Sequence, residues 1–185
     1  IVSIWFQHFI FYFRYGIRDT NAIVLNTFFL IIVLFFVYPL KFLTQFALYP
    51  VALVFKLDWL FNELNAISSG VEMGTLLAIY GFGASAIYFT LVLMYGYALK
   101  RKDDLKLSEI EVFDTRTSIQ TNVLVGLIPF VSASFALFLT GMWAGLISGS
   151  IYYLYPIVMP LYGRRVRRVR EKLLTKIAAQ GATNG

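Results

Sequence analysis

The chain contains uncharged stretches that are much longer than those of a soluble fold. Residues 117–163 give 47 consecutive positions without Asp, Glu, Lys or Arg, residues 73–99 give 27, and residues 20–40 give 21. About 20 apolar residues of helix cross a bilayer core of about 30 Å, so each shorter stretch predicts one span. A helix of 47 residues would measure roughly 70 Å, so the longest stretch predicts two spans with a break near Thr140 and Gly141.

The overall composition excludes most soluble functions. Apolar residues make up 59% of the chain and charged residues 14%, with a mean hydropathy of +0.72, whereas soluble domains carry about 25% charged residues. The chain has no Cys and one His, which excludes thiolate and His-based metal sites. Ser132 and Ser134 lie in a predicted span, but no span supplies a His or Lys base to activate them. We therefore predict no enzyme activity, no cofactor and no metal.

The N-terminal segment is apolar but short. Residues 1–13 are uncharged and rich in aromatic side chains, yet as helix they reach only about 20 Å. The chain starts with Ile1, without the basic region and small-residue cleavage site of a signal peptide. We expect a partial span over residues 1–17 of an N-terminally truncated chain; the alternative is a short interfacial helix that begins the protein.

The cations are distributed unevenly among the connecting segments. Of the 16 Lys and Arg residues, 14 lie in the 14–19 turn, the 100–117 linker and the segment after residue 163, whereas Lys41 and Lys56 lie between the second and third apolar segments. Positive residues favour the cytoplasmic side. The pattern predicts cytoplasmic placement for the 14–19 turn, the 100–117 linker and the C-terminus.

These patterns together predict an all-α, polytopic transmembrane helix bundle of four full spans and one partial span. Residues 46–65 are predicted to form an amphipathic, extracytoplasmic helix that either lies on lipid or is covered by protein. The 100–117 linker is predicted to be a solvated connector. We expect a single transmembrane domain over residues 1–163, with approximate helices at 1–17, 20–41, 46–65, 71–99, 118–139 and 142–163, a basic juxtamembrane helix at 164–178 and a disordered tail at 179–185.

The segment after the last span is strongly basic. It carries seven cations and one acidic residue, Glu171, between residues 164 and 176. A basic helix beside a span attracts anionic lipid at about 1 kcal/mol per cation, and its position next to a span favours lipid over nucleic acid. The predicted lipid-contacting residues are Arg164, Arg165, Arg167, Arg168 and Arg170.

A few polar side chains accompany the first two apolar segments. Asn26 lies inside the first full span and needs a hydrogen-bond partner there, because a buried amide without one costs a few kcal/mol. Asp19 and Asn26 are seven residues apart and share a helical face, and Trp5 and His8 share another. One interpretation is a polar cluster; the other is helix capping by Asp19 and interfacial anchoring by Trp5 and His8.

Small residues and prolines mark the later spans. Gly141, Gly145 and Gly149 repeat every four residues, a spacing that lets helices pack closely, either within one chain or between subunits. Pro129 is predicted to kink its span, as are Pro156 and Pro160 in the last one.

The first 45 residues carry a pattern that resembles a known family. The pattern is Trp5-x2-His8-x10-Asp19-x6-Asn26, followed by an apolar helix ending in Tyr38-Pro39. It is similar to the second and third helices of the transmembrane protein 175 family, the endosomal/lysosomal potassium channels and their bacterial relatives. The resemblance implies that a preceding helix with a Phe-Ser-Asp motif and an apolar constriction lines the pore, and that it is absent from these residues.

The resemblance also implies residue roles and an assembly. Trp5, His8, Asp19 and Asn26 would support the channel motif, and the chain would be a subunit of a homotetramer with potassium ion and the lipid bilayer as partners. We predict a potassium-permeable channel subunit in a bacterial plasma membrane. The alternative is a structural or accessory membrane subunit without transport activity.

Overall fold

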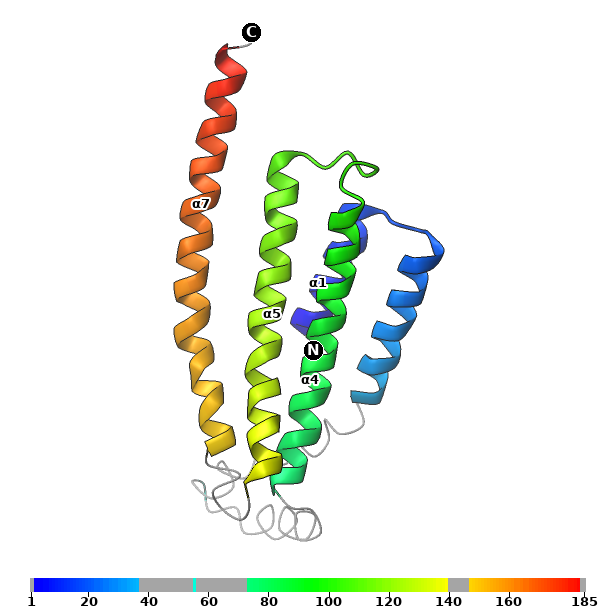
Figure 1. Ribbon diagram of the computed structural model, residues 1–185, viewed down its shortest axis with the longest axis vertical. Coiled ribbons are helices and arrows are strands. Elements are labelled where there is room, and N and C mark those ends of the chain that lie inside the picture. Colours follow the sequence, from blue (N-terminus) through cyan, green and yellow to red (C-terminus); the bar gives the residue numbers. More distant parts are fainter. Residues whose placement is uncertain (1, 37–54, 56–72, 140–146, 184–185) are drawn as a thin grey trace. The chain divides into compact units, whose positions relative to one another are not determined.

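The computed structural model describes residues 2–36, 55, 73–139 and 147–183, and the elements of these residues are helices (Figure 1). The labelled ones are α1 (Val2–Tyr15), α4 (Met73–Lys100), α5 (Glu109–Phe138), the 3-10 helix η1 (Ile151–Leu154) and α7 (Tyr155–Thr183). A further helix, Thr20–Phe36, follows α1 and is drawn in blue without a label.

Two of the four predicted full spans coincide with long apolar helices of the described residues. Two helices of the described part, Leu77–Lys100 and Glu109–Phe138, are long and apolar enough to cross a membrane by length and composition; the apolar helix Thr20–Phe36 is shorter. The expected connector at 46–65 and the expected break near Thr140 lie outside the described residues.

The turn between α1 and the next helix follows from two residues. Gly16 adopts a φ of +57°, a left-handed conformation that favours glycine, and its N–H donates to the Tyr12 carbonyl at 3.0 Å. The Asp19 carbonyl then accepts the first helical hydrogen bond, from the Ile23 N–H at 3.0 Å. This is the short helix-to-helix turn predicted at 14–19.

The 100–117 linker is more helical than its composition predicted, because α5 begins at Glu109. The reason is a capping box. The Glu111 carboxylate accepts hydrogen bonds from the Ser108 N–H at 2.8 Å and from the Ser108 hydroxyl at 2.7 Å. These hydrogen bonds hold the pKa of the Glu111 carboxyl below its ordinary value.

The C-terminal region is one helix where the sequence predicted three pieces. Helix α7 contains 29 residues and continues without interruption through the expected boundary at residue 163 and into the expected tail at 179–185, ending at Thr183. Pro156 lies in the first turn of α7, where its missing N–H removes no hydrogen bond of that helix. Pro160 does lie inside the helix.

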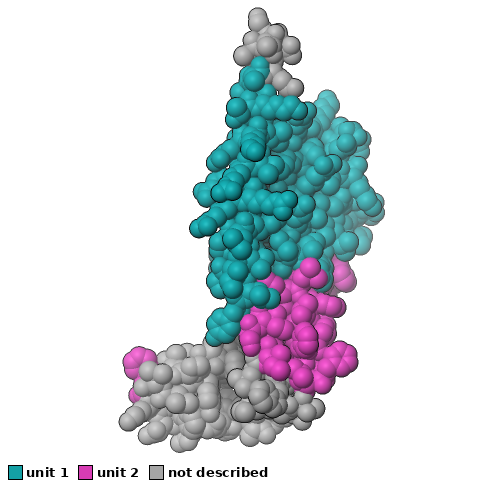
Figure 2. All heavy atoms as spheres, turned by 60° about the vertical axis from the view of Figure 1, so that its left-hand side comes forward, with its two compact units in different colours: residues 1–27, 88–125, 153–185 teal, residues 28–87, 126–152 magenta. Residues whose placement is uncertain are grey.

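The chain divides into two units, which Figure 2 shows in different colours. Unit 1 comprises residues 1–27, 88–125 and 153–185, and unit 2 comprises residues 28–87 and 126–152. The buried core of unit 1 includes Phe11, Tyr15, Leu91, Met94 and Tyr95, and that of unit 2 includes Phe29, Tyr80, Ile87, Ile128 and Ala133.

Unit 2 is held by a close approach of two helices. A Cβ placed on Gly81 of α4 would lie 2.5 Å from the Pro129 carbonyl oxygen and 2.7 Å from the Ala133 Cβ of α5. A buried hydrogen bond also joins α5 to residues 147–150, where the Ser132 hydroxyl donates to the Ser148 carbonyl at 2.8 Å. The helices of unit 2 therefore pack through small residues and backbone.

Candidate functional site: a polar cluster in unit 1

The predicted His and Asn meet in the structure. His8 Nε2 and Asn26 Oδ1 are 2.6 Å apart, joining α1 to the helix Thr20–Phe36 in a partly buried contact. The amide oxygen accepts, so the His8 nitrogen that faces it carries the proton. The His8 ring also packs edge-on against Tyr12, with ring centroids 5.2 Å apart. Asn26 thus has the partner that its apolar surroundings require.

Asp19 has other partners. Its carboxylate oxygen Oδ2 accepts hydrogen bonds from the Tyr97 hydroxyl and from Arg101 Nη1, the latter at 3.0 Å. The Tyr97 hydroxyl and the nearby Arg101 guanidinium hold the pKa of the Asp19 carboxyl below its ordinary value. Arg101 also forms an ion pair with Asp104 at 3.1 Å. Asp19 therefore connects the turn after α1 to the C-terminal end of α4.

Trp5 lies apart from this contact, on the outer face of α1. Its side chain is 70% exposed. The Trp5 ring stacks on Phe9, with centroids 6.4 Å apart, and Phe9 in turn stacks on Phe13 at 6.0 Å. The structure thus brings His8 and Asn26 together and places Asp19 and Trp5 in two other surroundings.

Tyrosine hydroxyls form links that sequence reasoning missed. The Tyr15 hydroxyl lies 2.6 Å from the Thr115 hydroxyl of α5, where both side chains are buried. The Tyr95 hydroxyl of α4 donates to the Gln7 carbonyl at 3.3 Å. Composition counts Tyr as apolar, yet each ring has a hydroxyl that needs a partner when buried. The available signal was the gathering of tyrosines near the charged ends of the spans.

A small polar recess adjoins these links. The Asn122 side chain is 1% exposed, and its amide nitrogen donates to the Ser118 carbonyl at 2.8 Å. Its Oδ1 atom accepts no hydrogen bond within the described residues. The recess measures about 280 Å³ and is also lined by Gln7, Tyr95 and Thr121. It has the room and the polar lining that ordered water requires.

Helix α7 is tied to α5 along its length in unit 1. The Tyr155 hydroxyl donates to the Val125 carbonyl at 2.7 Å, and the Tyr162 hydroxyl donates to Gln120 Oε1 at 2.8 Å. Towards the C-terminus, two Arg170 nitrogens donate to the two Asp114 carboxylate oxygens at 3.0 and 3.3 Å.

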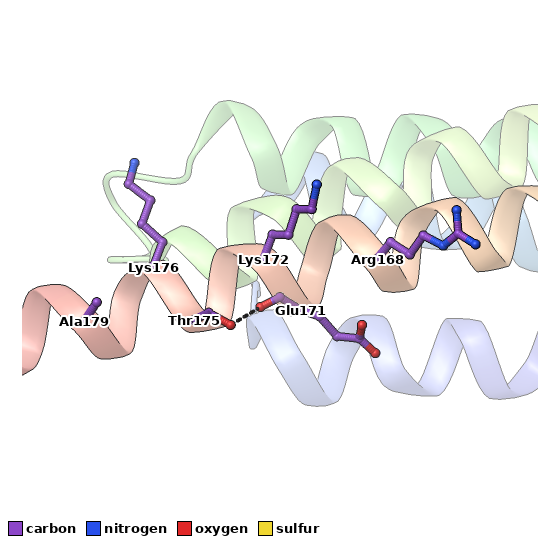
Figure 3. A pocket seen from close by; sticks show the side chains of 6 residues that line it. All are labelled: Arg168, Glu171, Lys172, Thr175, Lys176 and Ala179. Atoms are coloured by element: carbon purple, nitrogen blue, oxygen red, sulfur yellow. Dashed lines mark hydrogen bonds between the residues drawn. The ribbon is translucent and has the colours of Figure 1, made fainter.

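The five predicted lipid-contacting arginines are therefore not equivalent. Asp114 raises the pKa of Arg170 and engages its guanidinium, and Arg14 of α1 approaches the same carboxylate at 3.8 Å. Arg164, Arg165, Arg167 and Arg168 are exposed. Figure 3 shows Arg168 on a face of α7 that also carries Glu171, Lys172 and Lys176. Since all the labelled residues there come from one helix, this face is an open surface.

Comparison with known proteins decides the family. No family model matches the chain. A potassium channel of Marivirga tractuosa is 36% identical over 180 residues, which cover 94% of this chain and 71% of that protein. The chain belongs to the transmembrane protein 175 family of potassium channels. The fold is similar to that of the potassium channel MtTMEM175, known from a crystal structure of a threonine-to-alanine variant in complex with a nanobody–MBP fusion. The two structures match with a TM-score of 0.77 and 35% sequence identity, over 90% of this chain and 73% of that one.

Membership of the transmembrane protein 175 family confirms the resemblance that the first 45 residues showed. It also confirms that the chain is a membrane potassium-channel protein and not an enzyme, and that its helices form a polytopic membrane bundle. Among the described residues, no group of three or more His, Cys, Asp or Glu side chains could hold a metal ion.

The glycines of this transmembrane protein 175 family member differ in how closely other atoms approach them. Gly141 and Gly145 lie outside the described residues, and a Cβ on Gly149 would meet no atom within 4 Å. Among the described residues, close contacts lie instead at Gly81, against Pro129 and Ala133, and at Gly83, against the Phe36 ring; sequence reasoning missed both. The sequence does indicate close packing at Gly81, because Gly81 and Ser85 are four residues apart and give the same small-residue spacing.

Proposed function

We propose that this chain is a subunit of a potassium-permeable channel that conducts through a central pore. The observation that carries this proposal is the 36% identity to a potassium channel along 94% of the chain. The agreement with the potassium channel MtTMEM175 at a TM-score of 0.77 supports it. By the family resemblance, four such subunits surround the pore.

The pore constriction is proposed to lie on a helix with a Phe-Ser-Asp motif. The 185 residues contain no Phe-Ser-Asp sequence, so we assign no pore-lining residue within them. In such a pore, bulky apolar side chains gate by dewetting, and a filter of backbone carbonyls is not required. Reading the coding sequence upstream of Ile1 tests this: a complete N-terminus without the motif would contradict the proposed pore.

The proposed topology follows from the spans and the cations. We propose one transmembrane domain over residues 1–163 with four full spans and a partial one, and a cytoplasmic C-terminus in a bacterial plasma membrane. The placement of 14 of the 16 cations in alternate connecting segments supports this orientation. Protease accessibility of α7 in sealed, inside-out vesicles tests it, because a cytoplasmic α7 would be cleaved there and protected in right-side-out vesicles.

The polar residues are proposed to support the pore. The contact between His8 and Asn26 at 2.6 Å joins α1 to the helix Thr20–Phe36, and the hydrogen bonds of Asp19 to Tyr97 and Arg101 join the turn after α1 to the end of α4. We propose that His8, Asn26 and Asp19 thereby position the helix that carries the channel motif, with Trp5 on the exposed face beside them. Gly141, Gly145 and Gly149 are proposed to pack helices, and Arg164, Arg165, Arg167, Arg168 and Arg170 to contact anionic lipid.

Potassium flux tests the function itself. The full-length protein is reconstituted in liposomes with a potassium gradient, and efflux is compared with empty liposomes and with liposomes containing an unrelated membrane protein. We expect efflux well above both controls. Efflux equal to that of the empty liposomes would favour the accessory-subunit alternative.

A further inference from the structure

A groove runs between α5 and α7 in unit 1. It measures about 550 Å³, within the range of about 300–1,000 Å³ typical of small-molecule sites. The Tyr162 hydroxyl donates to Gln120 across it. Its lining residues are Phe113, Thr117, Ile119, Gln120, Val123, Leu124, Tyr162, Arg165, Val166 and Val169.

The lining is amphipathic in a specific way. Most of the lining side chains are aliphatic or aromatic, and one cation, Arg165, stands among them. The opposite wall supplies the polar groups of Thr117 and Gln120. An apolar trough with a single guanidinium matches a ligand that has a hydrocarbon part and an anionic head, because the guanidinium fork binds phosphate oxygens in a bidentate manner.

Two neighbouring arginines of α7, Arg167 and Arg170, are less suited to such a ligand. Arg170 is held by both oxygens of Asp114. Arg167 follows Arg165 by two residues and therefore projects about 200° around the helix from it. Neither residue lines the groove. The structure thus distinguishes Arg165 from neighbours that the sequence could not rank.

The position of the groove along the chain agrees with a lipid ligand. Its α7 wall, residues 162–169, contains the last uncharged residues of the long apolar stretch and the first arginines after it. Its α5 wall, residues 113–124, likewise joins the charged linker to the following apolar stretch. In a bilayer, lipid phosphates lie level with such a boundary between apolar and cationic residues, and the acyl chains extend to the apolar side of it.

We propose that the α5–α7 groove binds one anionic phospholipid per chain, with its phosphate on Arg165 and its acyl chain against Val123, Leu124 and the Tyr162 ring, which lie on the apolar side of Arg165. This site deepens the lipid contact given above and rests on the proposed membrane placement of α7. It differs from a general attraction of the basic helix to an anionic surface, since one arginine and one apolar wall define it.

Native mass spectrometry of the full-length protein in neutral detergent tests the headgroup contact. Phosphatidylglycerol and phosphatidylcholine are titrated separately, and retained lipid is counted per chain. We expect one retained phosphatidylglycerol per chain and weaker retention of phosphatidylcholine. Arg165→Gln should reduce phosphatidylglycerol affinity about tenfold, the loss of one charge-assisted contact, whereas Arg167→Gln, with the same change in charge, should reduce it about twofold or less. Equal effects of the two variants would overturn the proposal, and so would equal retention of the two lipids.

Filling the groove tests the acyl-chain contact. Val123→Trp should also reduce retention about tenfold, whereas Leu127→Trp, one turn further along α5 and outside the lining residues, should leave it within about twofold. Unchanged binding in Val123→Trp would overturn the proposal. A change of oligomeric mass in Val123→Trp before lipid is added would overturn it in favour of a second copy of the chain as the occupant.

The two proposals can fail separately. Potassium flux and lipid counting are both measured on the same purified full-length protein. Flux without retained phosphatidylglycerol would leave the channel function standing and remove the lipid site. Retained lipid without flux would do the reverse.

Discussion

Unit 1 and unit 2 differ in the kind of contact that holds the helices together inside each of them. Unit 1 is connected by side-chain hydrogen bonds and ion pairs, including His8 to Asn26 at 2.6 Å and Arg101 to Asp19 at 3.0 Å. Unit 2 relies on the approach of α4 to α5 at Gly81 and on edge-to-face aromatic pairs such as Phe82 with Phe130, whose centroids are 5.6 Å apart.

The difference reflects what each environment offers. Lipid supplies no hydrophobic driving force between helices, so close van der Waals packing between small residues must associate them there. Near the charged linkers, ionised groups remain solvated enough to form exposed or partly exposed pairs, which are individually weak. The packing contact of unit 2 should therefore be sensitive to side-chain volume, and the contacts of unit 1 to the chemistry of the paired groups and to pH.

The largest effect is expected from added volume in unit 2. Gly81→Val would place a side chain against the Pro129 carbonyl, which is backbone and cannot rotate away, so we expect a loss of about 3 kcal/mol. Thermal unfolding in detergent, followed by circular dichroism, measures it. Gly96→Val is the matched control in α4, since its Cβ would meet no atom within 4 Å. Similar losses in both variants would show that helix propensity, not the close contact, governs the result.

A smaller effect is expected from the amide contact of unit 1. Asn26→Leu removes the acceptor from His8 and should destabilise the protein by about 1–2 kcal/mol, the upper part of the range for interhelical hydrogen bonds in membranes. His8→Ala should act similarly, and the double variant should lose little more than either single one. Asn21→Leu, at an exposed position of the same helix, is the control. Fully additive losses would mean that the two residues do not act together.

The Asp19 contacts should give a stability difference that depends on pH. Because hydrogen bonding lowers the folded-state pKa of Asp19, its contribution is present above the ordinary carboxyl pKa and is lost as pH falls through the lower folded value. The thermal unfolding midpoint of the Asp19→Asn variant should therefore lie below that of the unmodified protein at pH 7, and the two midpoints should converge towards pH 3. Asp103→Asn removes an exposed carboxylate from the neighbouring connector as a control. A constant difference from pH 7 to pH 3 would contradict the assignment.

The smallest effect is expected at the ion pair between α5 and α7. Both Asp114 and Arg170 are partly exposed, so Arg170→Gln should destabilise by about 0.5–1 kcal/mol at low salt and by less at high salt. Thermal midpoints at two ionic strengths measure it, with Arg167→Gln as the control of equal charge. A loss that is independent of salt would point to packing by the Arg170 stem.

Local features of the fold were predictable, and pairings were not. The spans around residues 73–99 and 118–139 follow from uncharged length, and α4 and α5 cover both. The start of α5 was missed although Ser108 and Glu111 show the spacing of a capping box, because the charged composition of the linker was weighted more heavily. The continuity of α7 was missed because charge marks a membrane boundary without ending a helix.

The candidate site shows the same division. The sequence indicated that His8, Asp19 and Asn26 matter, because polar groups next to spans need partners. It could not identify Tyr97 and Arg101, which lie 78 and 82 positions from Asp19. Nor could it show that Trp5 points outward or that Asp114 engages Arg170, since helical spacing gives the face of one helix and not the neighbour of that face.

Membrane class, helical architecture and family were therefore readable from sequence alone, because hydropathy, span length and a spaced motif are properties of short segments. The tertiary structure decided which polar groups meet, which glycine permits a close approach, and which arginine lines the groove between α5 and α7. These outcomes depend on how distant helices are rotated and brought together, and that depends on the packing of the whole chain.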